Sequence, residues 1–361
     1  LFYKKQIKVL IISGIYMPDI GGPAIFVHSL SNYLKANNVP NEIIALAEID
    51  KLFVIKKDLI QIKRNSPKII RTILLMYFIL SRSLKSTKVL CCGLIFESFM
   101  ANIMMRKKLV FRFVGDSIWE KYIGPKDRNS FFNYKYNYKL KIILKFRNFI
   151  FRKYSLVITP SNFLKKYLKN NIGIKEFNIK VINNFPPISP ESIIIEDKNF
   201  YINKKNLKLI TLSRLVKWKN IDNLIKALRD IKNVELHILG SGPEEKNLKE
   251  LVKCEKMENI KFHGVKDRQY CLKILKSCDC FVQLSSYEGM SFSILESLYF
   301  CKPMILSDIE PNYETAKNAA IYVNNNKINK IREAINQVKS KKIRNTLTKT
   351  SHELLKVKYK K

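Results

Sequence analysis

The sequence predicts two α/β domains, each built around a parallel sheet. Its 361 residues fit two domains of ordinary size. Short apolar segments typical of buried strands alternate with helical patterns along both halves of the chain. Between the halves, residues 186–206 are rich in proline and polar side chains, as a linker is. We therefore place the two domains at residues 1–188 and 189–361.

The expected elements repeat one scheme in both halves. In the first half, strands are expected at residues 7–13, 41–47, 109–114 and 156–159, with a helix at 24–34. In the second half, strands are expected at residues 208–212, 234–239, 260–262, 280–284, 303–307 and 320–323, and helices at 221–228, 244–254 and 292–300. The last helix is a candidate to cross back to the first domain. Each half is therefore expected to be Rossmann-like, with ligands at the carboxyl ends of its strands.

The chain is strongly basic, with 66 Lys and Arg against 30 acids and a formal charge of +36. Such a charge attracts nucleic acid, acidic lipid or phosphorylated substrates, although a general richness in Lys, Ile and Asn also contributes. The excess is greatest at residues 51–88 and 126–169, where Asp58 and Asp127 are the only acids. No nucleic-acid-binding motif accompanies it.

Cysteines and apolar runs indicate the compartment. The seven cysteines are scattered without a C-x-x-C pair, which argues against zinc and favours free thiols in a reducing cytosol. The apolar run at 72–80 is too short to span a bilayer, and the run at 89–105 is interrupted by Glu97. No signal peptide is evident. We expect a cytoplasmic protein that is soluble or peripheral on the inner face of the membrane.

The most informative segment is residues 285–296, where an apolar strand hands over to a helix through a glycine turn. Backbone N–H groups of Gly289, Met290 and Ser291 and the positive end of the helix dipole suit a phosphate. Glu288 and Glu296 on either side offer acceptors for hydroxyl groups. This combination suits a ligand with both phosphate and polyol, such as a nucleotide sugar. The alternative is a capping box formed by Ser293 and Glu296, in which Glu296 serves only the geometry of its helix.

This segment closely resembles the Glu-x7-Glu motif of retaining glycosyltransferases of family 4, which have the GT-B fold. The resemblance covers nearly the whole chain and is strongest at residues 211–308. It implies two Rossmann-like domains whose parallel sheets face a central cleft, with the donor on the second domain and the acceptor on the first. It also implies that Glu288 approaches the donor sugar and that Glu296 holds the nucleotide ribose.

A second motif of that family follows the first expected strand of the second half. Residues 213–220 resemble its Arg-x4-Lys, here Arg214 and Lys219. In isolation the segment is a basic surface loop. Departure of a diphosphate builds negative charge, and fixed cations there favour the transition state over the ground state. No metal is then required, and no Asp-x-Asp of the metal-nucleotide type is found. We expect no cofactor beyond the nucleotide-sugar donor.

Glycine turns complete the expected donor site. Gly21 and Gly22 follow the first strand. In the family, the backbone of a glycine-rich loop at this place approaches the donor diphosphate. The simpler interpretation is a turn that needs a positive φ. Gly242 belongs to a Gly-x-Gly-Pro-Glu turn like the family's. Val265 lies in a segment resembling the loop that meets the nucleobase.

Two departures from the family pattern concern other strand and helix ends. Many relatives carry a His before Asp116, where this chain has Gly115. Asp116 is then left as the polar group that contacts acceptor or sugar, unless it only caps the next helix. Cys301 replaces the Gly expected to end the helix after Glu296.

These observations and the resemblance together predict a retaining glycosyltransferase of the hexosyltransferase type (EC 2.4). It is expected to move a sugar from a nucleotide-diphospho-sugar to a saccharide or lipid-linked acceptor in surface polysaccharide biosynthesis. Its rivals are a sugar-nucleotide epimerase of related fold and a basic nucleic-acid-binding protein. The paired motifs argue against the first, and the missing nucleic-acid motif argues against the second. The donor sugar, its base and the acceptor are not specified by the sequence.

Residues 131–154 interleave aromatic and aliphatic side chains with Lys and Arg, without any acid. One interpretation is a domain helix with Ile142, Phe146, Phe149 and Ile150 facing the core. The other is a face that, with the bases at 51–88, rests on an anionic membrane surface.

Overall fold

The structure is a computed structural model that describes residues 8–19, 21–86, 88–124, 126, 131, 136–185 and 206–359. The chain divides into two compact units. Unit 1 comprises the described residues of Leu1–Gly115 and Tyr136–Asn183, and unit 2 those of Asp116–Lys135 and Asn184–Lys361. The boundary expected at 188/189 falls outside the described residues, as does most of the expected linker.

Unit 1 is built on an eight-stranded sheet in the order β3-β4-β2-β1-β5-β6-β7-β8. Its strands are β1 (Val9–Ser13), β2 (Asn41–Ala47), β3 (Phe53–Lys56), β4 (Leu59–Lys63), β5 (Lys88–Cys91), β6 (Leu109–Arg112), β7 (Leu156–Thr159) and β8 (Ile179–Val181). All neighbours are parallel except the edge pair β3 and β4. The four expected strands are confirmed in β1, β2, β6 and β7, although residue 7 lies outside the described residues.

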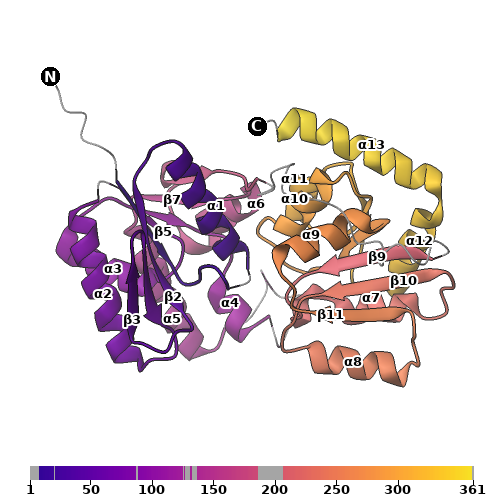
Figure 1. Cartoon of the computed structure of the whole chain (residues 1–361), viewed down its shortest axis with the longest axis horizontal. Coiled ribbons are helices and arrows are strands. Elements are labelled where there is room, and N and C mark those ends of the chain that lie inside the picture. The colour runs from indigo at the N-terminus through magenta and orange to yellow at the C-terminus, as the bar shows by residue number, and fades with distance from the viewer. Residues whose placement is uncertain are drawn as a thin grey trace. The chain divides into compact units, whose positions relative to one another are not determined.

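The helices of unit 1 are α1 (Gly22–Ala36), α2 (Lys68–Leu84), α3 (Ile95–Met105), α5 (Tyr138–Arg152) and α6 (Asn162–Tyr167). Helix α2 packs beside α3, and α3 contacts α5 (Figure 1). The apolar run at 72–80 thus belongs to α2, and the run at 89–105 is divided between β5 and α3. None of the described helices combines the length and apolar composition needed to cross a bilayer.

Helix α5 buries a different face from the one expected for a domain helix. Ile150 is buried, and so is its neighbour Phe151. Ile142, Phe146 and Phe149 were expected in the core, but they are 51%, 50% and 48% exposed. The expectation for these three residues is therefore wrong, and α5 presents apolar side chains outside the core of its unit.

Unit 2 is built on a six-stranded, wholly parallel sheet in the order β11-β10-β9-β12-β13-β14. Its strands are β9 (Leu207–Leu212), β10 (Val234–Leu239), β11 (Ile260–Gly264), β12 (Cys280–Gln283), β13 (Met304–Ser307) and β14 (Ile321–Val323). All six were expected, and they agree with the expected ranges to within two residues. Near-continuous apolar runs explain this agreement, because a parallel strand covered on both faces has little need of polar residues.

Helices cover both faces of the unit 2 sheet. They are α7 (Ile221–Leu228), α8 (Glu245–Cys254), α9 (Arg268–Ser277), α10 (Phe292–Tyr299), α11 (Glu310–Ala316), α12 (Ile328–Lys339) and α13 (Lys341–Lys358). Residues of α7, α8 and α12 form one apolar core with the sheet, and residues of α9, α10 and α11 form the other. Helix α13 packs against α10 and α12 (Figure 1). Its expected crossing back to the first domain stays a prediction.

The order of the strands places a topological switch point between β9 and β12. The chain leaves β9 toward β10 on one side and leaves β12 toward β13 on the other. The loops that follow these two neighbouring strands therefore diverge and leave space at the carboxyl edge of the sheet, where ligands of open α/β sheets bind. Arg214, Lys219 and Glu288 follow these strands before the next α-helix begins, whereas Glu296 lies in α10.

Candidate functional site

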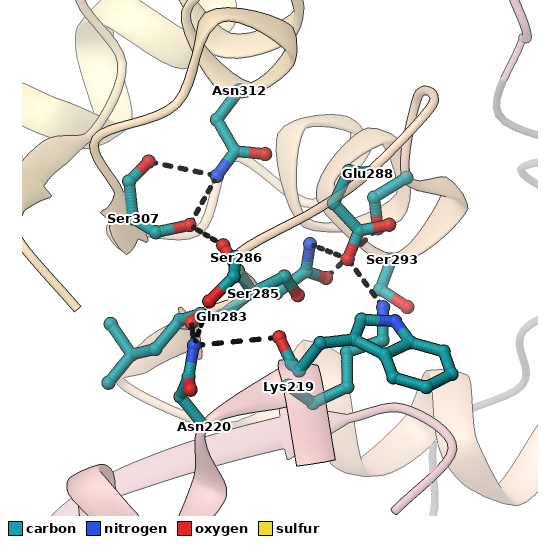
Figure 2. A network of polar contacts seen from close by, with 12 residues as sticks. Lys219, Asn220, Gln283, Ser285, Ser286, Glu288, Ser293, Ser307 and Asn312 are labelled. Carbon is teal, nitrogen blue, oxygen red and sulfur yellow. Dashed lines mark hydrogen bonds and ion pairs between the residues drawn. The ribbon is translucent and has the colours of Figure 1, made fainter. Parts of the chain in front are cut away.

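An ion pair between Lys219 and Glu288 joins the two loops at the switch point. Lys219 ends a short 3-10 turn, η5 (Lys217–Lys219), after β9, and Glu288 follows β12. Lys219 Nζ donates a hydrogen bond to Glu288 Oε1 (Figure 2). The two side chains remain 15% and 12% exposed, so a ligand can reach charges of both signs. The structure thus brings together one residue from each predicted motif.

Gln283, the last residue of β12, orients this pair and was missed by the sequence analysis. Its Nε2 donates to Glu288 Oε1 at 2.9 Å, and its Oε1 accepts from Ser291 Oγ at 2.9 Å. Ser291 therefore acts through its side chain as well as its expected backbone position. A single amide within an otherwise apolar strand was the available signal, because buried polar groups need partners.

Asn220 fixes the loop of Lys219 from below. It adopts a left-handed φ of 52°, and its Nδ2 donates to Leu284 O at 2.6 Å and Ser286 Oγ at 2.8 Å. Asn325 Nδ2 donates to the same two oxygens, at 3.1 and 3.0 Å. This shared network ties the loop after β9 to the loop after β12 (Figure 2).

The loop that carries Arg214 is packed on the glycine turn after β10. Leu215 N–H donates to Ser241 O at 2.9 Å. A Cβ on Gly242 would lie 2.3 Å from Leu215 O, which no real structure tolerates. Gly242 is therefore required to bring the two loops together, and its approach to a diphosphate stays a prediction. Arg214 itself is exposed.

Glu296 does not serve as a capping residue. Helix α10 has Ser291, not Ser293, as its N-cap, and Ser293 Oγ donates to Leu212 O at 2.9 Å. Glu296 is 2% exposed and pairs with Arg268 of α9, whose Nη2 lies 2.6 Å from Glu296 Oε1. Burial raises the pKa of the Glu296 carboxyl, and Arg268 opposes this rise. The capping-box alternative is therefore wrong. No local pattern marked Arg268 as the partner of Glu296.

Asp116 lies in unit 2 and caps α4 (Ser117–Tyr122). Its Oδ1 accepts from the N–H groups of Ile118 at 3.0 Å and Trp119 at 3.2 Å. The backbone N–H of Asp116 donates to the hydroxyl of Tyr287 at 2.9 Å. Tyr287 directly precedes Glu288 in the sequence. The capping role is confirmed, while a contact with acceptor or sugar stays a prediction.

Glu120 on α4 is a further carboxyl group that the sequence analysis passed over. Burial raises the pKa of Glu120 to about 7; Lys219 and Arg214 oppose the rise, whereas Asp116 and Glu288 add to it. Its only sequence signal was its position a few residues after the end of a strand. Acidic residues are common on helices, so this position did not distinguish it.

The remaining predicted donor residues occupy turns. Met290 is buried in the core, and its carbonyl accepts from Asn184 Nδ2 at 3.0 Å. Gly289 lies beside it in the same turn, while Val265 follows β11 and is 54% exposed. These residues offer backbone rather than side-chain groups to a ligand.

Gly21 and Gly22 lie in unit 1, where Gly22 begins α1 and Gly21 precedes it at the N-cap. The turn interpretation of this pair is confirmed, and a diphosphate contact stays a prediction. Within the described ranges, no three His, Cys, Asp or Glu side chains gather as a metal site requires.

The switch point of unit 2 thus presents two cations, acidic groups and backbone turns, which suit a ligand with phosphate and hydroxyl groups. Residues 193–354 match the family model described as glycosyl transferases group 1. This match covers a little less than half of the chain.

Known glycosyltransferases are similar to this chain in sequence and in fold. An uncharacterised glycosyltransferase, MJ1069 of Methanocaldococcus jannaschii, is 26% identical over 337 residues, which cover 85% of this chain and 82% of the relative. The O-antigen biosynthesis glycosyltransferase WbnH of Escherichia coli is 29% identical over 157 residues, 43% of this chain and 42% of WbnH. The structure of HepE from Anabaena with UDP-glucose aligns with a TM-score of 0.70 and 15% identity, covering 96% of this chain and 94% of that one. The chain therefore has the GT-B fold that the sequence predicts.

Proposed function

We propose that this protein is a retaining glycosyltransferase of family 4. It would move a sugar from a nucleotide-diphospho-sugar to a saccharide or lipid-linked acceptor in surface polysaccharide biosynthesis. The observation that carries the proposal is the Lys219–Glu288 pair at the switch point, within the residues that match the group 1 family model. The O-antigen function in the name of WbnH and the UDP-glucose bound to HepE support the acceptor and donor classes.

The proposed roles follow from charge. Arg214 and Lys219 would bind the diphosphate and stabilise the charge that builds as its bond to the sugar carbon breaks. The acceptor oxygen would attack the same face of that carbon, and its proton would pass to the departing diphosphate. No protein nucleophile and no metal ion would be needed. A hexose is the expected sugar, because the motifs resemble those of hexosyltransferases.

The remaining residues would orient the donor. Glu288 would accept hydrogen bonds from the sugar hydroxyls, and Glu296 would accept from the ribose. The turn of Gly289 and its two successors would offer N–H groups to phosphate. Asp116 would face the acceptor or sugar from the start of α4.

The test begins with thermal unfolding in the presence of UDP-, GDP-, ADP- and dTDP-sugars. A donor at 100 times its dissociation constant raises stability by about 2.7 kcal/mol. The stabilising sugar nucleotide is then incubated with saccharide acceptors, and the product's anomeric configuration is read by NMR. Retention supports the proposal. No stabilisation by any donor, inversion at the anomeric carbon, or epimerisation of the nucleotide sugar without an acceptor overturns it.

We also propose that unit 1 rests on an anionic membrane surface, which would place the protein on the cytoplasmic face of the membrane near a lipid-linked acceptor. Helix α2 exposes Ile69, Ile73 and Tyr77 at a four-residue spacing, with exposed fractions of 77%, 60% and 62%. Helix α5 adds its half-exposed apolar side chains. Both helices also carry basic residues, as do helices that lie in the interface of acidic membranes.

Three exposed bases of α5, Lys139, Lys141 and Lys145, provide the test. Each base near an acidic surface contributes about 1 kcal/mol, so reversing all three to Glu should release the protein from phosphatidylglycerol vesicles. Binding by the parent should also fall as salt rises. The matched control reverses Lys339, Lys341 and Lys342, exposed bases of unit 2. Equal vesicle binding by parent and α5 variant, or equal loss in both variants, would overturn a specific face.

A further inference from the structure

Helix α4 is held against both loops of the candidate site by aromatic packing. The Trp119 ring centroid lies 5.5 Å from that of Trp218 and 5.0 Å from that of Tyr287. Each partner directly precedes a member of the ion pair in sequence, namely Lys219 and Glu288. A segment of the chain far from the two motifs is therefore fixed beside both of them.

Gly124 shows how close this packing is. A Cβ at this position would lie 2.8 Å from the ring of Trp119 and 2.9 Å from the ring of Trp218. The hydrogen bond from Asp116 N–H to the Tyr287 hydroxyl, 2.9 Å long, fixes the other end of the helix. The position of α4 relative to the ion pair is thus set by apolar and polar contacts at both ends.

Glu120 directly follows Trp119 on this helix and is half-buried. The charges that act on it come from each element around it: Lys219 and Arg214 from the loop after β9, Glu288 from the loop after β12, and Asp116 from its own helix cap. Two cations and two carboxylates balance one another, so the charge of Glu120 decides the sign of the cluster. A diphosphate diester would add two further negative charges at the two cations.

We propose that Glu120 is a further residue of the donor site and takes up a proton when a nucleotide-diphospho-sugar binds. The inference rests on the proposed function. An ionised Glu120 would face the arriving diphosphate across the same two cations, and a protonated Glu120 would not repel it. The free protein holds Glu120 poised for this change, because its pKa is already raised to about 7.

The pH dependence of donor binding follows from this change in the charge of Glu120. A bound diphosphate raises the pKa of Glu120 further, so binding is tight below pH 7 and weakens as the pH rises through that value. The weakening ends once the pH exceeds the pKa of the complex. A Gln at this position carries no charge at any pH, so Glu120→Gln should bind donor more tightly than the parent at pH 8 and about equally at pH 6.

The test uses the full chain and four probes, UDP-glucose, GDP-mannose, ADP-glucose and dTDP-glucose, whose diphosphate diesters do not titrate between pH 6 and pH 8. For the probe that binds, the parent's Kd should rise about three- to tenfold more across this range than that of Glu120→Gln. Lys121→Gln, a change at the next and exposed position of α4, is the matched control and should keep the parental pH dependence. Comparing variants cancels the titration of groups that they share.

Each outcome decides the inference. Equal pH dependence in parent and Glu120→Gln overturns it while leaving the proposed function intact, and so does an equal change in Lys121→Gln. Binding of none of the probes to the parent means that the proposed function fails, and the inference falls with it. Should Glu120→Gln not fold, calorimetry of the parent at pH 7.5 in buffers of different ionisation enthalpy decides instead. Net proton uptake supports the inference, and none overturns it.

Discussion

The two units use the same topological position differently. In unit 1, the switch point lies between β1 and β5, and glycines fill it: a Cβ on Gly93 would lie 2.7 Å from the backbone nitrogen of Gly14. In unit 2, the switch point between β9 and β12 carries the Lys219–Glu288 pair and its supporting amides. The difference teaches that the fold supplies a position in both units, whereas the charged side chains needed for phosphate chemistry are found in unit 2.

The largest expected effect tests this contrast through Lys219. Lys219→Ala removes a cation from the proposed leaving group, and loss of one such contact lowers turnover by about 10²- to 10³-fold. Donor affinity should change much less, because the charge develops only as the bond breaks. Steady-state and single-turnover kinetics separate the two quantities.

Lys217 supplies the control for this substitution, since it is an exposed base on the same turn. Lys217→Ala should leave turnover within a few-fold of the parent. Parental turnover in Lys219→Ala would remove the chemical distinction between the two switch points.

The sequence predicted unit 2 more fully than unit 1, for physical reasons. Parallel strands buried on both faces are continuous apolar runs, so all six strands of unit 2 were found. The antiparallel edge hairpin β3–β4 was missed because the apolar runs in Phe53–Lys56 and Leu59–Lys63 are short and interrupted by Lys and Gln. Of the four side chains that the domain-helix interpretation placed in the core, α5 buries Ile150 alone, because helical periodicity does not say which side meets the sheet.

The residues of the candidate site likewise fall into those that the sequence predicted and those that it did not. Glu288, Lys219 and Glu296 were predicted because motifs mark them. Gln283 and Arg268 were not, because their importance lies in contacts between segments, such as the 2.6 Å pairing of Arg268 with Glu296 across 28 residues of chain. A packing relation of this kind leaves no local pattern in the sequence.

Close backbone approach is common to both units and provides the second prediction. Gly242→Ala and Gly93→Ala each drive a Cβ into backbone, at 2.3 and 2.7 Å, and should each lower the free energy of unfolding by about 2–4 kcal/mol. Thermal and denaturant unfolding measure the loss. Gly242→Ala should in addition weaken donor binding, because it displaces the loop of Arg214.

Gly14→Ala is the control for both substitutions, because its Cβ would meet nothing within 4 Å. It should keep parental stability. A tolerated Gly242→Ala would show that the packing of the Arg214 loop does not depend on this glycine.

A smaller effect is expected at the buried ion pair of unit 2. Arg268→Ala leaves Glu296 without its cation, so the pKa of Glu296 rises further and less of the carboxylate is ionised. Donor affinity should fall about tenfold at pH 7 and recover partly as the pH rises, because deprotonation restores the ribose acceptor. Arg268→Lys should rescue much of the loss.

Unit 1 contains a comparable ion pair between an Arg and a buried Glu, which serves as the control. Arg82 Nε lies 3.3 Å from Glu42 Oε1, and Glu42 is likewise buried. Arg82→Ala should reduce stability without changing nucleotide affinity, as isothermal calorimetry would show. If both Arg variants affected only stability, Glu296 would be a structural carboxylate.

The smallest effect concerns helix ends, where the two units should behave alike. Cys301 follows α10 with a left-handed φ of 50°, and Arg106 follows α3 with a φ of 51°. Hydrogen bonds from Cys301 N–H to Leu298 O and from Lys302 N–H to Ser297 O, both 2.8 Å, show that Cys301 occupies the place of the expected glycine. Cys301 therefore replaces the glycine of the family pattern, but α10 ends with the same backbone conformation and hydrogen bonds that a glycine would allow.

A non-glycine residue in this conformation costs about 1–2 kcal/mol, which the greater chain entropy of glycine offsets in part. Cys301→Gly and Arg106→Gly should therefore each raise the free energy of unfolding by about 0.5–1 kcal/mol in denaturant titrations. Equal gains in both units would show that backbone rules act alike throughout the chain, which confines the difference between the units to the side chains at their switch points. A loss of stability in Cys301→Gly alone would mean that the half-buried thiol contributes more by packing than its backbone costs.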